Sequence, residues 1–330
     1  MKTMTRLAVA GIAALAIAAA GTTAVLAQAF PTKPVTMLIP FAAGGPTDVV
    51  GRLVGEHLAR TLGQPVIIEN AVGAAGTLAG QRLMSSAPDG HTILIGHTGT
   101  HAAAVSLNPN LKYKPVEDFA PIGLVNTNPI FLSVRKTHPS QTLAEFVTWL
   151  KANEKTATNA HAGIGSVSHT TCLLFNTVLG VKPNGVPYRG TGPAMTDLVA
   201  GQIDYLCDQA VNVAPQERAG TIRTLAVASD ERAVFLPNVP TSTEGGVPGF
   251  KVAVWNAMFA PKDTPPAVVA KLNQALKAAL ADAGVKGKLQ ELGADVPVAA
   301  LLEPAGLRGF IGAEIEKWAP IIKASGVRIE

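Results

Sequence analysis

The stretch "PFAAGGPTDVVGRL" (residues 40–53) holds the residues whose types and spacing are best suited to chemistry. Gly44 and Gly45 allow a close backbone approach or a positive φ, and Pro46 favours the first position of a helix. Free N–H groups at such a helix start bind anions without a basic side chain. The loop could therefore hold a phosphate, a nucleophile or another anion. Asp48 would lie on the first helical turn, where it either offsets the helix dipole or orders waters or a donor group of a ligand.

The known nucleotide-binding loops are excluded by their motifs. No G-x-x-x-x-G-K-[ST] run occurs in the chain. The run "GIGSVS" (163–168) approaches G-x-G-x-x-G, but it ends in Ser168, and no acid follows until Asp197. A dinucleotide site needs an acid about 20 residues after its motif to bind the ribose. We therefore predict no nucleotide and no other cofactor.

Covalent and metal chemistry also lack their motifs. Ser166 and Ser168 stand before a predicted helix and next to His169, but the chain has no G-x-S-x-G nucleophile elbow. His97 and His101 are four residues apart in "HTGTH", which we expect to be a loop without a third metal ligand. We therefore predict neither a catalytic residue nor a metal site.

A long acid-free stretch favours anion binding. No Asp or Glu occurs from residue 155 to residue 196. The same stretch holds His161, His169, Lys182 and Arg189. Its run "GIGSVSH" predicts a second helix start rich in N–H and hydroxyl donors, and "YRGTGP" (188–193) predicts a third donor loop. Only Asp48 and Asp208 bring negative charge to the predicted loops at the strand ends.

The N-terminus has the pattern of a signal peptide. Two basic residues precede an uncharged, mostly apolar run (7–21), and the following "AVLAQAF" contains small residues at a cleavage site. We expect cleavage after Ala27, with Ala29 as the alternative. The apolar run is short for a membrane span, which needs about 20 residues. Residues 1–27 are therefore a predicted signal peptide, and we expect the mature protein to be exported.

Composition narrows the class of partner. The chain has 27 Lys and Arg against 23 Asp and Glu, and loss of the signal peptide removes two bases and no acid. This small positive charge, without a basic run, indicates no nucleic-acid-binding surface. A mature chain of about 300 residues usually divides into two domains.

The predicted elements alternate between strand and helix. "VTMLI" (35–39), "VIIE" (66–69) and "HTILIG" (91–96) are predicted strands, separated by loops and amphipathic helices. This order is the βαβ signature of a parallel sheet. A second α/β set begins near residue 128, and we expect helices after residue 261. Because no low-complexity linker joins the sets, we infer two lobes with crossing strands and a cleft between them.

The two cysteines, Cys172 and Cys207, do not have the spacing of a metal site. Export permits a disulfide between them. The sequence does not supply the Cα separation that a disulfide needs, so two buried thiols remain the alternative.

Seven segments together resemble a known family. They are "FPTKPVTMLIPFAAGGPTD", "LGQPVIIENAVGAAGTLAG", "APDGHTILIG", "PVEDFAPIG", "VPYRGTGPAMTDLVAGQID", "LAVASDERAVFLPNVPTSTEGG" and "MFAPKDTP". Their order and spacing cover the whole mature chain. In these segments the sequence resembles the Bug-type extracytoplasmic solute receptors, the substrate-binding proteins of tripartite tricarboxylate transporters.

The resemblance implies an α/β protein with the type II periplasmic-binding-protein fold, in which two βαβ lobes surround a cleft and two crossing strands join them. Lobe 1 would comprise residues 28–128 plus 253–330, and lobe 2 residues 129–252. The implied function is capture of a small mono- or dicarboxylate, aliphatic or aromatic, by a periplasmic monomer for uptake through membrane permease subunits. An exported α/β enzyme acting on carboxylic acids and an orphan sensory receptor are the alternatives.

The family's binding loops, which hold a carboxylate by backbone N–H groups, hydroxyls and waters, map onto thirteen positions. They are Phe41, Ala43, Gly44, Thr47, Asp48, Asn70, Gly76, Thr98, Thr100, Gly165, Ser166, Ser168 and Asp208. Two departures concern the ligand: His97 precedes "TGT", and "CDQ" (207–209) stands where a Phe-Asp pair is more usual. A Cys172–Cys207 disulfide would be specific to part of the family. We expect Asp48→Ala to weaken ligand binding more than folding, because a surface acid on a first helical turn contributes only about 0.3–1 kcal/mol.

Overall fold

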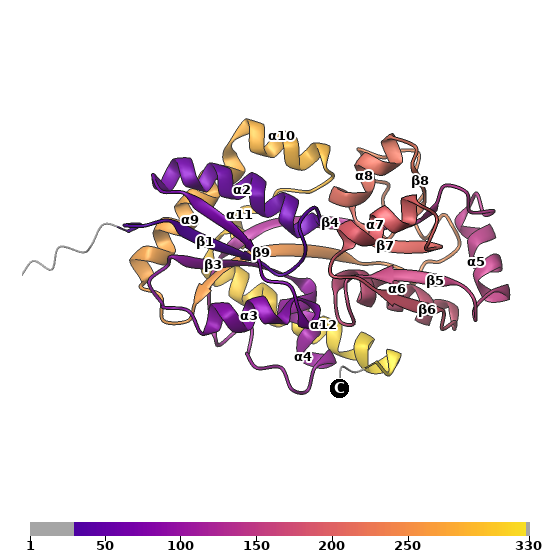
Figure 1. Ribbon diagram of the computed structural model, residues 1–330, viewed down its shortest axis with the longest axis horizontal. Helices are drawn as coiled ribbons and strands as arrows, with labels where there is room; N and C mark the ends of the chain where they lie inside the picture. The colour runs from indigo at the N-terminus through magenta and orange to yellow at the C-terminus, as the bar shows by residue number, and fades with distance from the viewer. Residues whose placement is uncertain (1–29, 328–330) are drawn as a thin grey trace, which may run out of the picture.

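The computed structural model describes residues 30–327, which form two α/β halves arranged along the longest axis of the molecule (Figure 1). The predicted signal peptide and both of its cleavage sites lie outside the described residues. Among the helices of residues 30–327, none is both long enough and apolar enough to cross a bilayer.

The first half, which we call lobe 1, is built on three parallel strands. β1 (Val35–Ile39) pairs with β2 (Val66–Asn70) on one side and with β3 (Thr92–His97) on the other, as the sequence predicts. Its helices are α2 (Pro46–Leu62), α3 (Thr77–Met84), α9 (Pro266–Ala281), α10 (Ala283–Glu291), α11 (Ala299–Leu302) and α12 (Pro304–Ser325), with a 3-10 turn at Ala74–Gly76. Because the strands are parallel, the loops that follow them share one edge of the sheet.

The second half, lobe 2, repeats this arrangement. Parallel strands β7 (Tyr205–Gln209), β5 (Thr158–His161) and β6 (Asn184–Pro187) lie in that order. Its helices are α5 (Leu143–Ala152), α6 (Val167–Leu179), α7 (Thr191–Val199) and α8 (Ala210–Arg218), and its remaining strand is β8 (Ile222–Val227). The loops after β5 and β7 face the corresponding loops of lobe 1.

Long strands connect the lobes and place all strands in one curled sheet of order β2-β1-β3-β9-β4-β7-β5-β6, with β8 on β4. Within β4 (Phe119–Arg135), residues 119–129 pair with β9 (Ala253–Pro261), and residues 130–135 pair with β7 and β8. The predicted two-lobe fold is confirmed, while the lobe boundaries stay a prediction. β4 begins at residue 119, earlier than the predicted second set. Pro121 cannot donate a backbone hydrogen bond to the neighbouring strand, but a register shift next to it lets the pairing with β9 continue.

In "HTGTH", His97 ends β3 and residues 98–101 are helical, so the expectation of a loop was wrong. A π turn (Gly99–Ala103) leads directly into α4 (Ala104–Leu107). The ring nitrogen Nδ1 of His97 accepts hydrogen bonds from the N–H groups of Gly99 and Thr100, at 2.8 and 3.3 Å. This side-chain cap satisfies donors that a helix start otherwise leaves free. The glycine in this stretch suggested a loop, because the sequence does not show that the His97 side chain caps the helix start.

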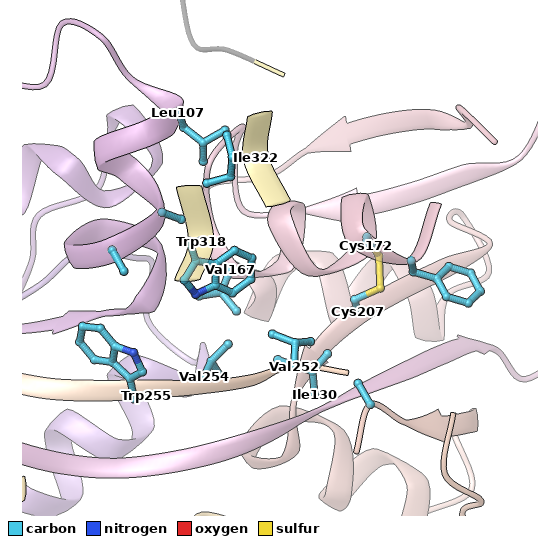
Figure 2. Packing of buried hydrophobic residues seen from close by; sticks show 14 of the residues in the cluster. Leu107, Ile130, Val167, Cys172, Cys207, Val252, Val254, Trp255, Trp318 and Ile322 are labelled. Atoms are coloured by element: carbon cyan, nitrogen blue, oxygen red, sulfur yellow. A yellow bond between two sulfur atoms is a disulfide. The ribbon is translucent and has the colours of Figure 1, made fainter. Parts of the chain in front are cut away.

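One hydrophobic cluster contains side chains of both lobes. Trp255 on β9 and Trp318 on α12 are its two largest fully buried side chains, and Figure 2 shows both in the cluster with Val167 of α6. The cysteines also lie here. A disulfide joins Cys172 on α6 to Cys207 on β7, with Cα atoms 5.3 Å apart, inside the range that the bond requires (Figure 2).

Candidate ligand-binding cleft

The starts of four helices meet at one cavity between the lobes. The cavity has a volume of about 320 Å³, including the solvent at its mouth, which is at the small end of the range for ligand sites. Its lining residues are Phe41, Gly45, Pro46, Thr47, His97, Ala162, Ser166, Val167, Ser168, Thr191, Asp208 and Gln209. Most lie within two positions of the N-cap of α2, α6, α7 or α8. Helix starts carry partial positive charge, so this lining can attract an anion although its described residues include no Lys or Arg.

Three of these four helix starts have no side-chain cap. The N-cap residues Gly45 of α2, Gly190 of α7 and Gln209 of α8 make no capping hydrogen bond with a side chain. The N-cap of α6 differs, because Ser166 Oγ accepts from the N–H of His169 at 3.3 Å. First-turn N–H groups of three helices are therefore not engaged by an N-cap side chain.

Asp48 is buried behind the first loop, with only 2% of its surface exposed, so the expectation of a surface acid was wrong. Its carboxylate accepts from the N–H of Gly44 at 3.0 Å, from Arg52 Nε at 2.9 Å and from Asn70 Nδ2 at 2.8 Å. Asn70 Nδ2 also donates to the carbonyl oxygen of Phe41 at 2.8 Å. Burial acts to raise the pKa of Asp48, but these donors outweigh it and the pKa is lowered. Asp48 thus holds the loop from behind and is not a lining residue.

His97 presents a donor to the cavity. Burial lowers the pKa of His97 to about 3, so the ring is neutral. Because Nδ1 accepts the N–H of Gly99, the ring proton resides on Nε2, which has no partner among the described residues. The ring stacks on Phe41 with centroids 4.9 Å apart and planes at 4°. His97 is thereby oriented as a neutral N–H donor next to an aromatic wall.

Three predicted residues support the loops and do not line the cavity. Thr98 Oγ1 accepts from the backbone N–H of Trp255 at 2.9 Å, and Thr100 Oγ1 accepts from that of His97 at 3.1 Å. Gly76 has φ 89°, and a Cβ atom there would lie 2.9 Å from the methyl carbon of Thr100. The position therefore requires glycine for both its backbone and its close contact.

The loop between β5 and α6 presents two serine hydroxyls to the cavity. Ser168 Oγ accepts from the N–H of Ala162 at 2.9 Å and lies 3.2 Å from Ser166 Oγ. Gly163 and Gly165 have φ values of 98° and 95°, in the left-handed region that favours glycine. Gly165 therefore shapes the loop, whereas the two serines line the cavity.

Asp208 is the acid that lines the cavity. Its carboxylate accepts from the N–H of Gln209 at 2.8 Å and from Asn212 Nδ2 at 2.5 Å. Burial raises the pKa of Asp208 to about 6, because these neutral donors, with a further hydrogen bond from Thr191, offset only part of the desolvation. Near neutral pH the cavity therefore contains one carboxylate without a cationic partner among the described residues.

The lobes touch directly beside the cavity. The N–H of Ala42 in lobe 1 donates to the carbonyl oxygen of Arg189 in lobe 2 at 3.3 Å. A Cβ atom on Gly190 would lie 3.1 Å from the backbone nitrogen of Ala42, and one on Gly192 would lie 3.1 Å from the carbonyl carbon of Gly44. These glycines let the two backbones approach, so the structure is a closed form of the cleft.

The structure thus separates the thirteen predicted site residues into three groups. Those that line the cavity are Phe41, Thr47, Ser166, Ser168 and Asp208. Ala43 and Gly44 border a neighbouring hollow, and the remaining six support the loops. The lining residues that the prediction did not include are Gly45, Pro46, His97, Ala162, Val167, Thr191 and Gln209. The sequence could have indicated these residues by their position, because most of them stand at the N-cap or in the first turn of a predicted helix. That any of them binds a ligand stays a prediction.

In residues 30–327, no group of three or more His, Cys, Asp or Glu side chains is placed to hold a metal ion.

Comparison with known proteins identifies the family. The model of the tripartite tricarboxylate transporter family receptor, TctC, matches residues 50–327. The chain is 47% identical to MatC of Rhodopseudomonas palustris, solved with bound malate, with a TM-score of 0.87 over 89% of this chain and 100% of MatC. It is 39% identical to the periplasmic binding protein BugD, with a TM-score of 0.88 over 91% of this chain and 100% of BugD. An R. palustris protein solved with adipate is 32% identical, with a TM-score of 0.86 over 91% of this chain and 99% of that protein. The chain therefore belongs to the tripartite tricarboxylate transporter receptor family, as a Bug-type receptor with the periplasmic-binding-protein fold.

Proposed function

We propose that this protein is a periplasmic receptor that binds a small aliphatic dicarboxylate and delivers it to the membrane permease of a tripartite tricarboxylate transporter. The observation that carries the proposal is the convergence of four helix starts, from both lobes, on one small cavity without a cationic side chain. Such starts bind carboxylates through N–H groups and dipoles. The similarity to proteins solved with malate and with adipate supports a dicarboxylate.

The two ends of a dicarboxylate would use different donors. On the lobe 1 side, the start of α2 and the Nε2–H group of His97 would bind one carboxylate. On the lobe 2 side, Ser166, Ser168 and the starts of α6 and α7 would bind the other. A ligand that engages both lobes would stabilise the closed form, and the permease would recognise the receptor in that form.

Asp208 would select among dicarboxylates. An ionised carboxylate repels a ligand carboxylate but accepts a hydrogen bond from a hydroxyl group. Because Asp208 lines the cavity and lacks a cation, a 2-hydroxy diacid that points its hydroxyl at this side chain would bind better than the corresponding unsubstituted diacid. The proposed ligand class is therefore the short hydroxy-dicarboxylates.

Export by residues 1–27 and a monomeric state complete the proposal. The pattern of the N-terminal residues supports export, and similarity to a periplasmic binding protein supports the periplasm as the destination.

A receptor that closes over its ligand alters no bond in it. Incubation of malate with the mature protein should therefore leave the proton NMR spectrum of malate unchanged.

Calorimetry of refolded, ligand-free mature protein tests the function. We expect binding of malate and of succinate, tighter binding of malate, and no binding of the neutral diamide of malate, which lacks the charges that helix starts attract. A chelator should leave the affinity unchanged. If no aliphatic dicarboxylate binds at millimolar concentration, or if the diamide binds as well as the diacid, the proposal is wrong.

A further inference from the structure

A second hollow lies on the other side of the lobe 2 binding loop. It is formed where β5, β6 and α6 meet the C-terminal end of α12, which reaches lobe 2 in Figure 1. None of its lining residues lines the cavity between the lobes. Five of the residues that line the hollow have polar side chains on which the inference depends: Asn159, His161, His169, Asn176 and Lys182.

The two histidines of this hollow are fixed in one tautomer. His161 Nδ1 accepts from the N–H of Gly163 at 3.1 Å, and His169 Nδ1 accepts from that of Gly165 at 3.2 Å. Burial lowers the pKa of both rings, that of His169 to about 4, so both are neutral near pH 7. Their protons therefore reside on Nε2, and neither Nε2–H group has a partner among the described residues. The ring centroids are 4.9 Å apart.

Two buried amides add to these donors. Asn176 Oδ1 accepts from the hydroxyl of Tyr205 at 2.8 Å, which leaves its Nδ2 group without a partner in residues 30–327. The side chain of Asn159 makes no hydrogen bond with the described part of the chain. Asn159, His161 and Asn176 are 5%, 3% and 6% exposed, so each is a buried polar group without a full set of partners. Such groups are uncommon unless water or a ligand satisfies them.

Charge and access define what the hollow can hold. Lys182 lines it, and its described lining residues include no acid. Glu154, which accepts from the backbone N–H of Lys182 at 2.8 Å, is not a lining residue. Gly185 keeps the approach open, because a Cβ atom there would lie 3.0 Å from His161 Nε2. A transition metal is disfavoured, since Nδ1 of each ring is engaged and the protonated Nε2 has no lone pair to offer.

We propose that this hollow is a second binding site, which takes a small oxyanion through the Nε2–H groups of His161 and His169 and the amide of Asn176. The site is independent of the proposed transport function, because it uses none of the residues that line the cleft. It is nevertheless linked to the cleft. The same two rings hold the N–H groups of Gly163 and Gly165, in the loop that presents the cleft serines.

Histidine-resolved ¹⁵N NMR on the mature protein, titrated with sulfate, tests the site. We expect saturable shifts of the His161 and His169 Nε2 signals. Parallel titrations with phosphate and with acetate show which oxyanion binds best. Sulfate shifts confined to His97 would mean that the anion binds only in the cleft, and that result would overturn the proposal. The absence of any saturable histidine shift would overturn it equally.

Two substitutions of His169 separate anion binding by its ring from its structural role, which is to hold the N–H of Gly165. His169→Asn places an oxygen near the former Nδ1, so it keeps the bond to Gly165 and removes the Nε2–H donor. His169→Gln does the opposite. We expect His169→Asn to weaken sulfate binding by about tenfold or more, as for loss of one hydrogen bond to a charged group, and His169→Gln to weaken it by no more than about threefold. Equal sulfate affinity in the two variants would contradict the proposal.

Asn176→Asp supplies a check that does not alter a histidine. The new carboxylate can still accept the hydroxyl of Tyr205, so the fold retains this hydrogen bond. It replaces a donor by a negative charge at the site and should abolish the sulfate-dependent shifts of His161 and His169. If sulfate still shifts both signals with unchanged affinity, Asn176 does not face the anion and the proposed site is wrong.

Discussion

Asp48 on the first turn of α2 and Asp208 near the end of β7 both lie at a strand-to-helix junction, yet their surroundings give them opposite properties. The pKa of Asp48 is lowered because Arg52, Asn70 and a backbone N–H outweigh the effect of burial. The pKa of Asp208 is raised to about 6 because burial outweighs its neutral donors. Asp208 lines the cavity and Asp48 does not. An acid at such a junction is thus either neutralised by a cation inside its own lobe or left without a cationic partner at the cavity.

The helix-start loops β1–α2 of lobe 1 and β5–α6 of lobe 2 also differ in the groups that hold them. In lobe 1, a network that includes the Arg52 guanidinium holds the loop from behind. In lobe 2, neutral groups, namely histidine rings and serine hydroxyls, hold the β5–α6 loop. In the proposed function, lobe 1 would therefore offer a fixed anion platform, and lobe 2 a polar surface whose one carboxylate would discriminate among ligands.

Forcing the two loops apart where they meet should give the largest effect. Gly192→Leu places a side chain against the backbone of Gly44 and Gly45, so the closed form is disfavoured while each lobe stays intact. We expect the affinity for the dicarboxylate to fall by about 100-fold or more, since the apparent affinity scales with the population of the closed form. The free energy of unfolding should change by no more than about 1 kcal/mol, because leucine suits a helix better than glycine.

Gly287→Leu on α10 is the matched control for this experiment. An added Cβ atom at Gly287 meets nothing within 4 Å, so the same change in helix propensity occurs far from the cleft. Calorimetry should find unchanged affinity in this variant. Retained affinity in Gly192→Leu would show that the two loops need not come together, and the division of roles between the lobes would lose its basis.

Asp48→Ala should cause the next largest effect, now on stability. The substitution removes three hydrogen bonds to a buried carboxylate, so we expect the free energy of unfolding to fall by about 2–3 kcal/mol. Glu56→Ala changes an exposed acid of the same helix and should stay within about 0.5 kcal/mol. Urea unfolding of the ligand-free proteins measures both. If the free energy of unfolding of Asp48→Ala falls by less than about 1 kcal/mol while its ligand affinity falls strongly, Asp48 serves ligand binding and not folding. The contrast with Asp208 would then be wrong.

The prediction for Asp48 shows where the sequence was informative and where it was not. A short apolar run located β1, apolar residues at helical spacing located α2, and the glycines and Pro46 located the helix start. The partner Arg52 stands four residues on, in helical register, but Asn70 ends a different strand, β2, and only the folded sheet brings it to the carboxylate. Burial of Asp48 depends on that tertiary contact, so an acid that is buried in the fold was expected at the surface.

The lining residues of the cleft were partly predictable for a related reason. Helix starts can be recognised from glycine, proline and serine signals, and four such starts converge on the cavity. The role of His97 was not visible, because it depends on which ring nitrogen the turn at Gly99 engages. Side-chain direction and tautomer are set by contacts within the folded chain, and no local pattern encodes them.

The pH dependence of stability should differ in sign between the two acids. For Asp208 the folded-state pKa, about 6, exceeds the ordinary value of 3.8. Between these values the folded state keeps a proton that the unfolded state has released, so stability falls as pH rises through the window and is flat above it. For Asp48 the folded-state pKa lies below 3.8, so its contribution is complete above 3.8 and is lost as pH falls through the folded-state pKa.

Asp208→Asn isolates this smaller effect. Buried histidines such as His97 and His169 have lowered pKa values and give stability the opposite slope between pH 4 and 6.5, so the wild-type curve alone mixes the contributions. Because these histidines remain in the variant, the wild-type minus variant difference cancels them. Urea unfolding at pH 4 to 7.5 should show this difference falling by about 2 kcal/mol between pH 4 and 6 and then staying constant. The same subtraction for Asp48→Asn should be constant over that range and change only in more acidic solution. A flat difference for Asp208→Asn would mean that this carboxylate ionises like an ordinary acid, and the two strand-end acids would then be equivalent despite their different surroundings.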